Sequence, residues 1–149
     1  MTEFLEFTID KFTFRVATDR WYNDQGVWAN PEGERVRVGL SDFVQQRSGD
    51  VAFAEVKPVG TTLALGDEVA VIESIKVNVS FSSPLGGKIV ESNPAMKDTP
   101  EVVNQDPFGE GWLAVIDPAD WAADCRRLLD AQAYFARMKK EAEEEAKML

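Results

Sequence analysis

Few residues in this sequence are suited to chemistry, and the most distinctive is Lys76, which lies in a stretch of alternating apolar and polar side chains. Apolar residues recur at most second positions from Val69 to Phe81, and polar residues, Lys76 among them, fall between them. The alternation predicts one β-strand with Lys76 on its polar face, followed by a turn at residues 83–87. Taken alone, such a lysine is most simply a solvated surface charge.

The residue types that are missing exclude several kinds of catalytic site. The sequence has no histidine and a single cysteine, Cys125. A Ser-His-Asp triad, a Cys/His zinc site and an internal disulfide are therefore excluded. The sequence also lacks paired carboxylates, a phosphate-binding loop and an activated nucleophile. We therefore expect a protein that is not itself an enzyme and that binds no metal.

The charge balance limits the partners that this chain can bind. The 149 residues include 16 Lys and Arg against 26 Asp and Glu, for a formal net charge of −10. An acidic surface disfavours nucleic acid and anionic membranes and favours docking to basic patches on other proteins. No apolar run approaches the roughly 20 residues of a membrane helix, and the N-terminus has no secretory pattern. We expect a single domain over residues 1–149, located in the cytoplasm.

Local patterns predict most of the regular elements around Lys76. We expect a strand over residues 12–16 and a hairpin over residues 27–40 that turns at residues 30–33. A short helix should begin at Ser41 or Asp42 and end at Gly49. Further strands are expected at residues 50–56 and 112–116, the second being the closing strand.

The C-terminal part of the chain is predicted to form one helix. Asp117 can cap it, and Pro118 suits its first position because the missing N–H needs no partner there. Trp121, Cys125, Leu128 and Phe135 then share one face, so Cys125 is expected to be a packed residue. Residues 137–149 are expected to form a charged helical tail that frays and is solvated.

Several segments of the chain resemble the H protein of the glycine cleavage system, and the resemblance covers most of residues 20–135. Residues 103–113 resemble the family segment Asn-x-Asp-Pro-Tyr-Gly-x-Gly-Trp, with Phe108 in place of Tyr. This segment separates H-type proteins from the shorter lipoyl and biotinyl domains. The other matching segments are residues 36–43, 49–60, 73–76 and 83–93, the last two resembling the lipoyl-attachment region.

The resemblance implies a fold and a modification. The implied fold is mainly β, a flattened antiparallel β-barrel or sandwich of the lipoyl/biotinyl (hammerhead) type, with short helices and a C-terminal α-helix. It also implies a turn near Ile75 and Lys76, which divides the predicted strand into two and places Lys76 at a hairpin tip. Lys76 would carry lipoic acid as an amide. Glu73 would aid recognition by the lipoylating enzyme, or would simply be a solubilising charge.

The function that the resemblance implies is that of a non-catalytic lipoyl-lysine carrier. It would shuttle an aminomethyl group and reducing equivalents in glycine cleavage. Its partners would be glycine decarboxylase, aminomethyltransferase and dihydrolipoamide dehydrogenase. A lipoate-protein ligase or lipoyl transferase would load it.

Two departures from the family pattern keep other functions open. Gly26 stands where H proteins usually have His, and Ser80 stands where they usually have Asp. Both positions are expected near the place where the loaded arm rests. The alternative is an H-protein-like lipoate-binding carrier for bacterial sulfur oxidation, acting with a heterodisulfide-reductase-like complex. A further alternative is an unmodified interaction module that uses the acidic surface.

Overall fold

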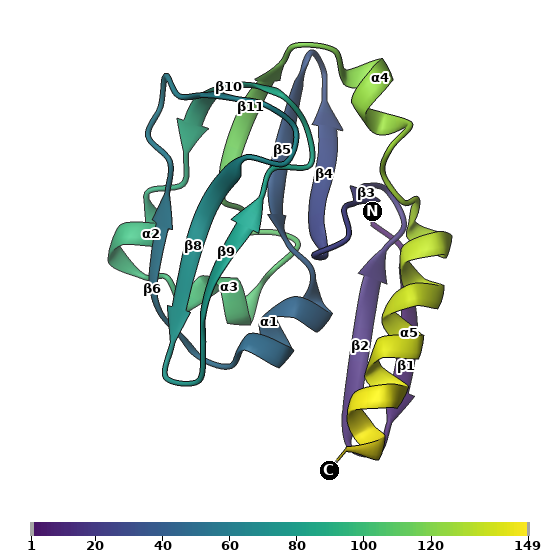
Figure 1. Ribbon diagram of the computed structural model, residues 1–149. Coiled ribbons are helices and arrows are strands. Elements are labelled where there is room, and N and C mark those ends of the chain that lie inside the picture. Colours follow the sequence, from purple (N-terminus) through teal and green to yellow (C-terminus); the bar gives the residue numbers. More distant parts are fainter. Residues whose placement is uncertain (1, 149) are drawn as a thin grey trace.

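Antiparallel sheets form most of the computed structural model, which describes residues 2–148 (Figure 1). One sheet pairs β1 (Phe4–Ile9) with β2 (Phe12–Ala17). A second has the order β3-β4-β5-β11-β10-β7, and a third has the order β6-β8-β9. The bounds in these two sheets are β3 Trp21–Tyr22, β4 Val27–Glu32, β5 Arg35–Leu40, β6 Val51–Val56, β7 Thr62–Leu63, β8 Glu68–Ser74, β9 Asn78–Ser82, β10 Gly87–Ser92 and β11 Ala114–Pro118.

An aliphatic cluster joins the two larger sheets. Val38 and Ile116 contribute to it from the six-stranded sheet, and Ile72 and Phe81 contribute from the three-stranded sheet. All four side chains are buried, as expected where two sheet faces exclude water from a shared core. The prediction of a mainly β, flattened barrel or sandwich with short helices and a C-terminal helix is confirmed.

An aromatic cluster lies beside the first one and holds the two ends of the chain together. Phe14 of β2, Trp28 of β4 and Phe43 belong to it, together with Tyr134 and Met138 near the C-terminus. The Phe14 and Phe43 rings meet edge to face at 5.2 Å, a favoured geometry for aromatic pairs. This cluster fixes the β1–β2 hairpin against the rest of the fold.

The predicted hairpin and helix between residues 27 and 48 are confirmed. Strands β4 and β5 pair from Val27 to Leu40, with the turn at residues 33–34 rather than 30–33. Helix α1 (Asp42–Ser48) is capped by Ser41, whose Oγ accepts a hydrogen bond from the Val44 N–H at 3.4 Å. Gly49 ends the helix with a φ of 82°, which favours glycine.

The segment after β10 is rich in Pro and Gly but contains regular structure. It contains two single-turn helices, α2 (Ala95–Asp98) and α3 (Val102–Gln105). Met96 and Val103 are their buried residues and belong to the aliphatic cluster. None of the helices within residues 2–148 has the length and apolar character needed to span a membrane.

The prediction of one C-terminal helix capped by Asp117 is wrong. Residue Pro118 ends strand β11, and two helices follow, α4 (Trp121–Cys125) capped by Asp120 and α5 (Ala131–Lys147) capped by Asp130. The break between them has a physical cause, because Leu129 exchanges two backbone hydrogen bonds of 2.8 Å with Tyr22 of β3. This pairing satisfies backbone groups that a continuous helix would otherwise use.

The tail is helical as predicted, but the expectation that it is a solvated extension is wrong for one of its faces. Met138 and Ala142 are buried against the aromatic cluster. Figure 1 shows α5 running alongside the β1–β2 hairpin, which explains this burial. Residue 149, at the end of the predicted tail, lies outside the described residues.

The predicted alternation along residues 69–81 is right at its two ends and wrong in register between them. Val69 and Phe81 are buried as predicted, but Ala70 and Ile72 are buried as well, and Ile75 is 97% exposed. An irregularity in the β8–β9 pairing between Glu68 and Ala70 shifts the inward-facing set by one position. The turn after Ser74 then takes Ile75 out of the sheet altogether.

Candidate functional site

Lys76 lies at the tip of the β8–β9 hairpin. Strand β8 ends at Ser74 and β9 begins at Asn78, so Ile75 and Lys76 occupy the turn between them. The Ser74 N–H donates to the Val77 carbonyl at 2.8 Å and closes the turn. The structure therefore presents Lys76 on a short, closed loop.

The Ser74 side chain fixes this turn, which has no glycine, proline or asparagine at its centre. Its hydroxyl donates to the Ser48 carbonyl at 2.7 Å and accepts from the Val77 N–H at 3.1 Å. One hydroxyl thus ties the hairpin tip to the end of α1. A serine that bonds to nearby backbone is a known local turn device, and this signal was overlooked in the sequence.

The Lys76 side chain extends along the end of α1 rather than straight into solvent. Its Nζ donates to the Arg47 carbonyl at 3.5 Å, a long contact. A Cβ placed on Gly49 would lie 3.3 Å from Lys76 Cδ, so the glycine leaves room for the stem. Among residues 2–148, the structure shows no ion pair that includes Lys76. The amine is exposed and is not neutralised by a carboxylate.

Glu73 lies on β8, one residue before the end of the strand at Ser74. Its carboxylate accepts a hydrogen bond from Asn78 Nδ2 across the hairpin at 3.3 Å, and the side chain is exposed. The structure places it near the tip, where an approaching enzyme can contact it. Its role in recognition by a lipoylating enzyme stays a prediction.

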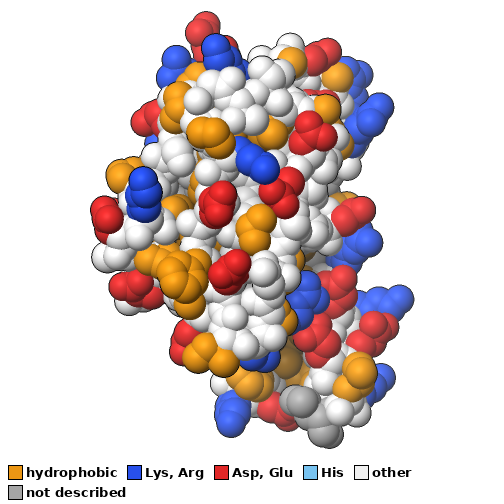
Figure 2. Space-filling view, turned by 60° about the vertical axis from the view of Figure 1, so that its left-hand side comes forward, with side chains coloured by type: hydrophobic (Ala, Val, Ile, Leu, Met, Phe, Trp, Pro, Cys, Tyr) orange, Lys and Arg blue, Asp and Glu red, His pale blue; other side chains and the backbone are white. Residues whose placement is uncertain are grey.

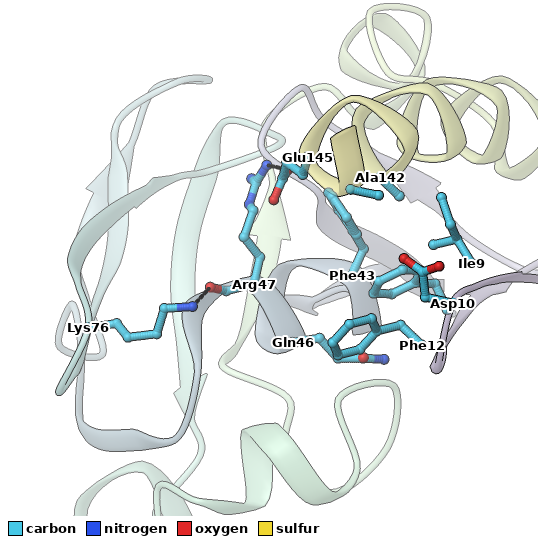
Figure 3. Close-up of a pocket in the computed structure, with 11 residues that line it drawn as sticks. Ile9, Asp10, Phe12, Phe43, Gln46, Arg47, Lys76, Ala142 and Glu145 are labelled. Atoms are coloured by element: carbon cyan, nitrogen blue, oxygen red, sulfur yellow. Dashed lines mark hydrogen bonds and ion pairs between the residues drawn. The ribbon is translucent and has the colours of Figure 1, made fainter. Parts of the chain in front are cut away.

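A pocket of about 290 Å³ lies beside Lys76 (Figure 3). Lys76 is one of its lining residues, and Figure 3 shows the amine directed toward Arg47 at its rim. Three of its eleven lining residues are aromatic, and four are charged. The lining residues are Ile9, Asp10, Phe12, Phe14, Phe43, Gln46, Arg47, Lys76, Ala142, Glu145 and Ala146.

No motif in the sequence predicts this pocket. Its walls come from the β1–β2 hairpin, from α1 and from the end of α5, which are far apart in the chain. Phe12 and Phe14 are large aromatic residues, which indicates that this segment packs against another part of the chain. Nothing in the local pattern indicated that they pack next to residues 142–146.

The two departures from the family pattern have different structural settings. Gly26 has a φ of 79°, and a Cβ there would lie 2.5 Å from Val44 Cγ2 and 2.6 Å from the Tyr134 hydroxyl. This backbone and this close packing exclude a histidine side chain in the present arrangement. Residue 26 therefore supplies no side chain in place of the imidazole that H proteins usually have here.

At the second departure, the structure brings an acid close to Ser80. The Ser80 hydroxyl donates to Glu68 Oε1 at 2.6 Å, and Lys57 Nζ pairs with Glu68 Oε2 at 3.0 Å. The hydrogen bond from Ser80, together with Lys57, lowers the pKa of Glu68. A carboxylate from the neighbouring strand thus lies beside the position where the resemblance led us to expect Asp. Sequence reasoning missed Glu68 because the contact is across strands.

Charged side chains of both signs surround the site. Figure 2 shows acidic and basic groups interspersed over one face of the molecule, with apolar side chains between them. Exposed apolar residues include Phe53 on β6 and Ile75 at the hairpin tip. The surface is therefore mixed in character, although the net charge is −10.

Comparison with known proteins gives concordant matches. The family model "Glycine cleavage H-protein" matches residues 20–141. The chain is 43% identical to the glycine cleavage system H protein of Thermus thermophilus over 127 residues, which are 85% of this chain and 98% of the relative. It is 42% identical to that of Bacteroides thetaiotaomicron over 115 residues, 77% of this chain and 90% of the relative.

A solved structure agrees with these matches. The crystal structure of a glycine cleavage system H protein from Mycobacterium marinum superposes with a TM-score of 0.73. The sequence identity is 31%, and the match covers 80% of this chain and 96% of that one. Residues 1–19, which include the β1–β2 hairpin, and residues 142–149 lie outside the region that the family model matches.

Proposed function

The chain belongs to the glycine cleavage H-protein family, and we propose that it carries lipoate as an amide on Lys76. The single observation that carries this proposal is the placement of Lys76 on an exposed hairpin tip, with its amine outside any ion pair among the described residues. A ligase must take this amine into its own active site, so an exposed and unpaired amine suits the reaction.

The residues around Lys76 fit a lipoyl group. The stem of Lys76 runs over Gly49 toward a pocket with an aromatic wall, so the apolar arm has an apolar surface within its path. Attachment removes the positive charge of the amine, whose hydrogen-bond partner among residues 2–148 is the Arg47 carbonyl. Within that part of the chain, no carboxylate would lose an ion-pair partner on modification.

The chain contributes presentation rather than catalysis in this function. When attached, lipoate supplies disulfide–dithiol exchange and group transfer on sulfur. Ser74 holds the base of the arm in place through its bonds to Ser48 and Val77. A tether of this kind raises the effective concentration of the carried group at a docked enzyme to about the millimolar range. Glu73 would contribute to recognition by the ligase or transferase.

We further propose that the cargo is an aminomethyl group with its reducing equivalents. The arm would visit glycine decarboxylase, aminomethyltransferase and dihydrolipoamide dehydrogenase. The carboxylate of Glu68 beside Ser80 supports a cationic cargo, since it supplies negative charge near the expected resting place. The sulfur-carrier alternative remains the second candidate because Gly26 leaves no room for the histidine that H proteins usually have.

The first experiment is intact-mass analysis of the native protein, with peptide mapping across residues 69–88. We expect one lipoyl adduct on Lys76, absent from Lys76→Arg. Lys88→Arg is the matched control, because Lys88 is an exposed lysine on β10 and should leave the adduct unchanged. An unmodified Lys76 after incubation with a matched ligase and lipoate would contradict the proposal.

An exchange assay on the same lipoylated protein then identifies the cargo. We expect it to support glycine–bicarbonate exchange with its cognate glycine decarboxylase, and the Lys76→Arg variant to support none. Loaded protein that fails in this exchange would keep the carrier role but remove the aminomethyl cargo. The sulfur-carrier function would then take its place.

A further inference from the structure

We propose that the pocket beside Lys76 is a docking site for the enzyme that attaches the lipoyl group, and that this enzyme inserts an apolar side chain between the β1–β2 turn, α1 and α5. This inference rests on the proposed modification of Lys76. It adds a recognition surface that is separate from Glu73. Seven of the eleven lining residues fall outside residues 20–141, the region that the family model matches, so the surface belongs to segments that this chain adds to that region.

The position of the reacting atom identifies the partner. Attachment joins the lipoyl carbonyl carbon to Lys76 Nζ, while an activated acyl donor loses its leaving group with the bonding electron pair and the ammonium group gives up two protons. Lys76 lines the pocket, and its Nζ lies 3.5 Å from the Arg47 carbonyl on the rim (Figure 3). The lipoylating enzyme must bring its acyl donor to this nitrogen, so its surface comes up to the mouth of the pocket. Enzymes that later act on the dithiolane work at the far end of the arm and are not held to this place.

The pocket has a rigid floor and an exposed apolar rim. Phe14 and Phe43 form the floor, where they are buried in the aromatic cluster. Phe12 lies beside Phe14 with its ring centroid 6.3 Å away, and it keeps 41% of its surface exposed although it is a large apolar residue. The cavity of about 290 Å³ is close to the lower end of ligand pockets, which hold roughly 300–1,000 Å³. An apolar side chain of a partner would fill this space and cover Phe12, as anchor residues do at protein interfaces.

Helix α1 holds the amine and the pocket in one fixed arrangement. Its Arg47 carbonyl accepts the hydrogen bond from the amine. On its other side, Gln46 Nε2 donates to the Thr13 carbonyl of β2 at 3.0 Å, and Asp42 Oδ2 accepts from the Arg15 N–H of β2 at 2.9 Å. An enzyme docked in the pocket is therefore aligned with the amine through a single helix. Such a contact strengthens binding without touching the reacting atoms.

The charges of the lining favour an apolar contact over a charged one. Before modification, Lys76 and Arg47 are balanced by Asp10 and Glu145. Arg47 Nη1 already pairs with Glu145 at 3.2 Å, and its guanidinium lies 4.9 Å from the Phe43 ring centroid. A balanced set of charges gives no net attraction for a cation or an anion, whereas the aromatic surface attracts apolar groups. The side chain that enters the pocket is therefore expected to be aliphatic or aromatic.

The test measures lipoylation of the full-length apo protein by its own lipoylating enzyme at a saturating concentration of acyl donor. Phe12→Asp places a charge at the mouth of the pocket, at a position that is already partly exposed. We expect kcat/KM to fall about tenfold through a higher KM, with kcat retained within about twofold. Ala146→Trp fills the pocket from α5 and should raise KM in the same way.

Leu65→Asp is the matched control. Leu65 is 38% exposed, close to the exposure of Phe12, and it precedes the start of β8 whereas Lys76 follows the end of that strand. Its KM should equal that of the wild type. Hydrogen exchange on all three variants checks that the β1–β2 hairpin and α5 stay folded.

Each other outcome overturns the inference. A wild-type KM in both Phe12→Asp and Ala146→Trp, or a loss confined to kcat, would show that the enzyme does not dock in the pocket, while lipoylation of Lys76 and the proposed function would stand. A wild-type dimer that Phe12→Asp converts to a monomer in sedimentation velocity would assign the pocket to a second copy of the chain instead. An unmodified Lys76 in the wild-type protein would overturn the proposed function as well.

Discussion

The aliphatic cluster between the two larger sheets and the aromatic cluster beneath α5 differ in composition and in what they hold together. The first draws its members from residues 27–116, all inside the region matched to the H-protein family. The second joins Phe14 near the N-terminus to Met138 and Ala142 near the C-terminus. The carrier scaffold and the added pocket are therefore stabilised by separate cores.

The aromatic cluster also contains polar atoms that the aliphatic one lacks. The Tyr22 hydroxyl donates to the Ala17 carbonyl at 2.7 Å, and Trp28 Nε1 donates to the Leu40 carbonyl at 3.0 Å. The hydroxyls of Tyr134 and Ser41 lie 2.8 Å apart in a buried hydrogen bond. These bonds offset the cost of burying the groups and fix the orientation of the rings. The two buried phenols of Tyr22 and Tyr134, whose pKa values burial raises, also make this cluster the more sensitive of the two to alkaline pH.

The largest expected loss of stability comes from a cavity in either cluster. The two cavities should increase hydrogen exchange in different parts of the molecule. Leu85→Ala and Met138→Ala each remove a fully buried side chain and should each lower the free energy of unfolding by about 2–5 kcal/mol. Leu85→Ala should raise hydrogen exchange throughout the two larger sheets. Met138→Ala should raise it first in α5 and the β1–β2 hairpin, which local opening can release.

Hydrogen exchange resolved by peptide mass spectrometry distinguishes these outcomes. Lipoylation of Lys76 should survive in Met138→Ala at a temperature where that variant is folded. If both variants lost protection evenly along the chain, the two clusters would form one cooperative unit and the comparison would fail.

An intermediate loss of folding stability is expected at alkaline pH. Burial raises the pKa of Tyr134 to about 12, against an ordinary value near 10, and burial also raises the pKa of Tyr22. Because the folded-state pKa is the higher one, the stability from the neutral phenol is fully present below pH 10. It is lost as the pH rises from about 10 to 12. We expect Tyr134 to contribute a loss on the order of 1–3 kcal/mol over this window.

Denaturant titrations at pH 8–12 measure this loss. Tyr134→Phe should cost about 1 kcal/mol at pH 8 through the missing bond to Ser41, and its stability should fall less steeply with pH. Leu85→Ala is the control from the other cluster and should keep the wild-type slope. A Tyr134→Phe curve parallel to the wild type would show that this phenol does not set the alkaline limit.

The smallest effect is expected for Arg47→Gln at the contact between α1 and α5. Arg47 pairs with Glu145 at 3.2 Å and reaches Glu141 at 4.0 Å, but these side chains are exposed to solvent. Exposed ion pairs contribute about 0–1 kcal/mol, and salt screens them. We expect a change of that size in global stability, with faster exchange confined to the last turns of α5. A loss well above 1 kcal/mol would mean that this contact, and not the aromatic cluster, holds α5 in place.

Sequence reasoning succeeded where a short segment determines its own structure. The 27–40 hairpin and the Ser41-capped helix follow from turn residues and capping chemistry within a few positions. The turn at Lys76 came only from the resemblance, because Ser74 replaces the usual turn residues with a hydroxyl that bonds to the backbone. The position of the candidate lysine was thus predictable, whereas its hydrogen-bond partners were not.

Sequence reasoning failed where distant segments meet. The C-terminal helix is interrupted because Leu129 pairs with Tyr22, and no local pattern contains that information. Glu68 faces Ser80 across two strands whose register depends on an irregularity. The pocket beside Lys76 combines three segments, so it follows from the packing of both chain ends rather than from any motif.

The placement of Lys76 against the end of α1 limits the solid angle from which another molecule can reach its amine. Gly49 and the Arg47 carbonyl lie beneath the side chain, while Ile75 next to it projects into solvent with 97% of its surface exposed. The β1–β2 hairpin and α5 occupy the far side of the pocket. An enzyme that takes up the proposed lipoyl-lysine would therefore need an entrance that admits a narrow loop from the Ile75 side. In that function, the shape of the hairpin would act as a steric filter that selects enzymes by their entrances before any specific contact forms.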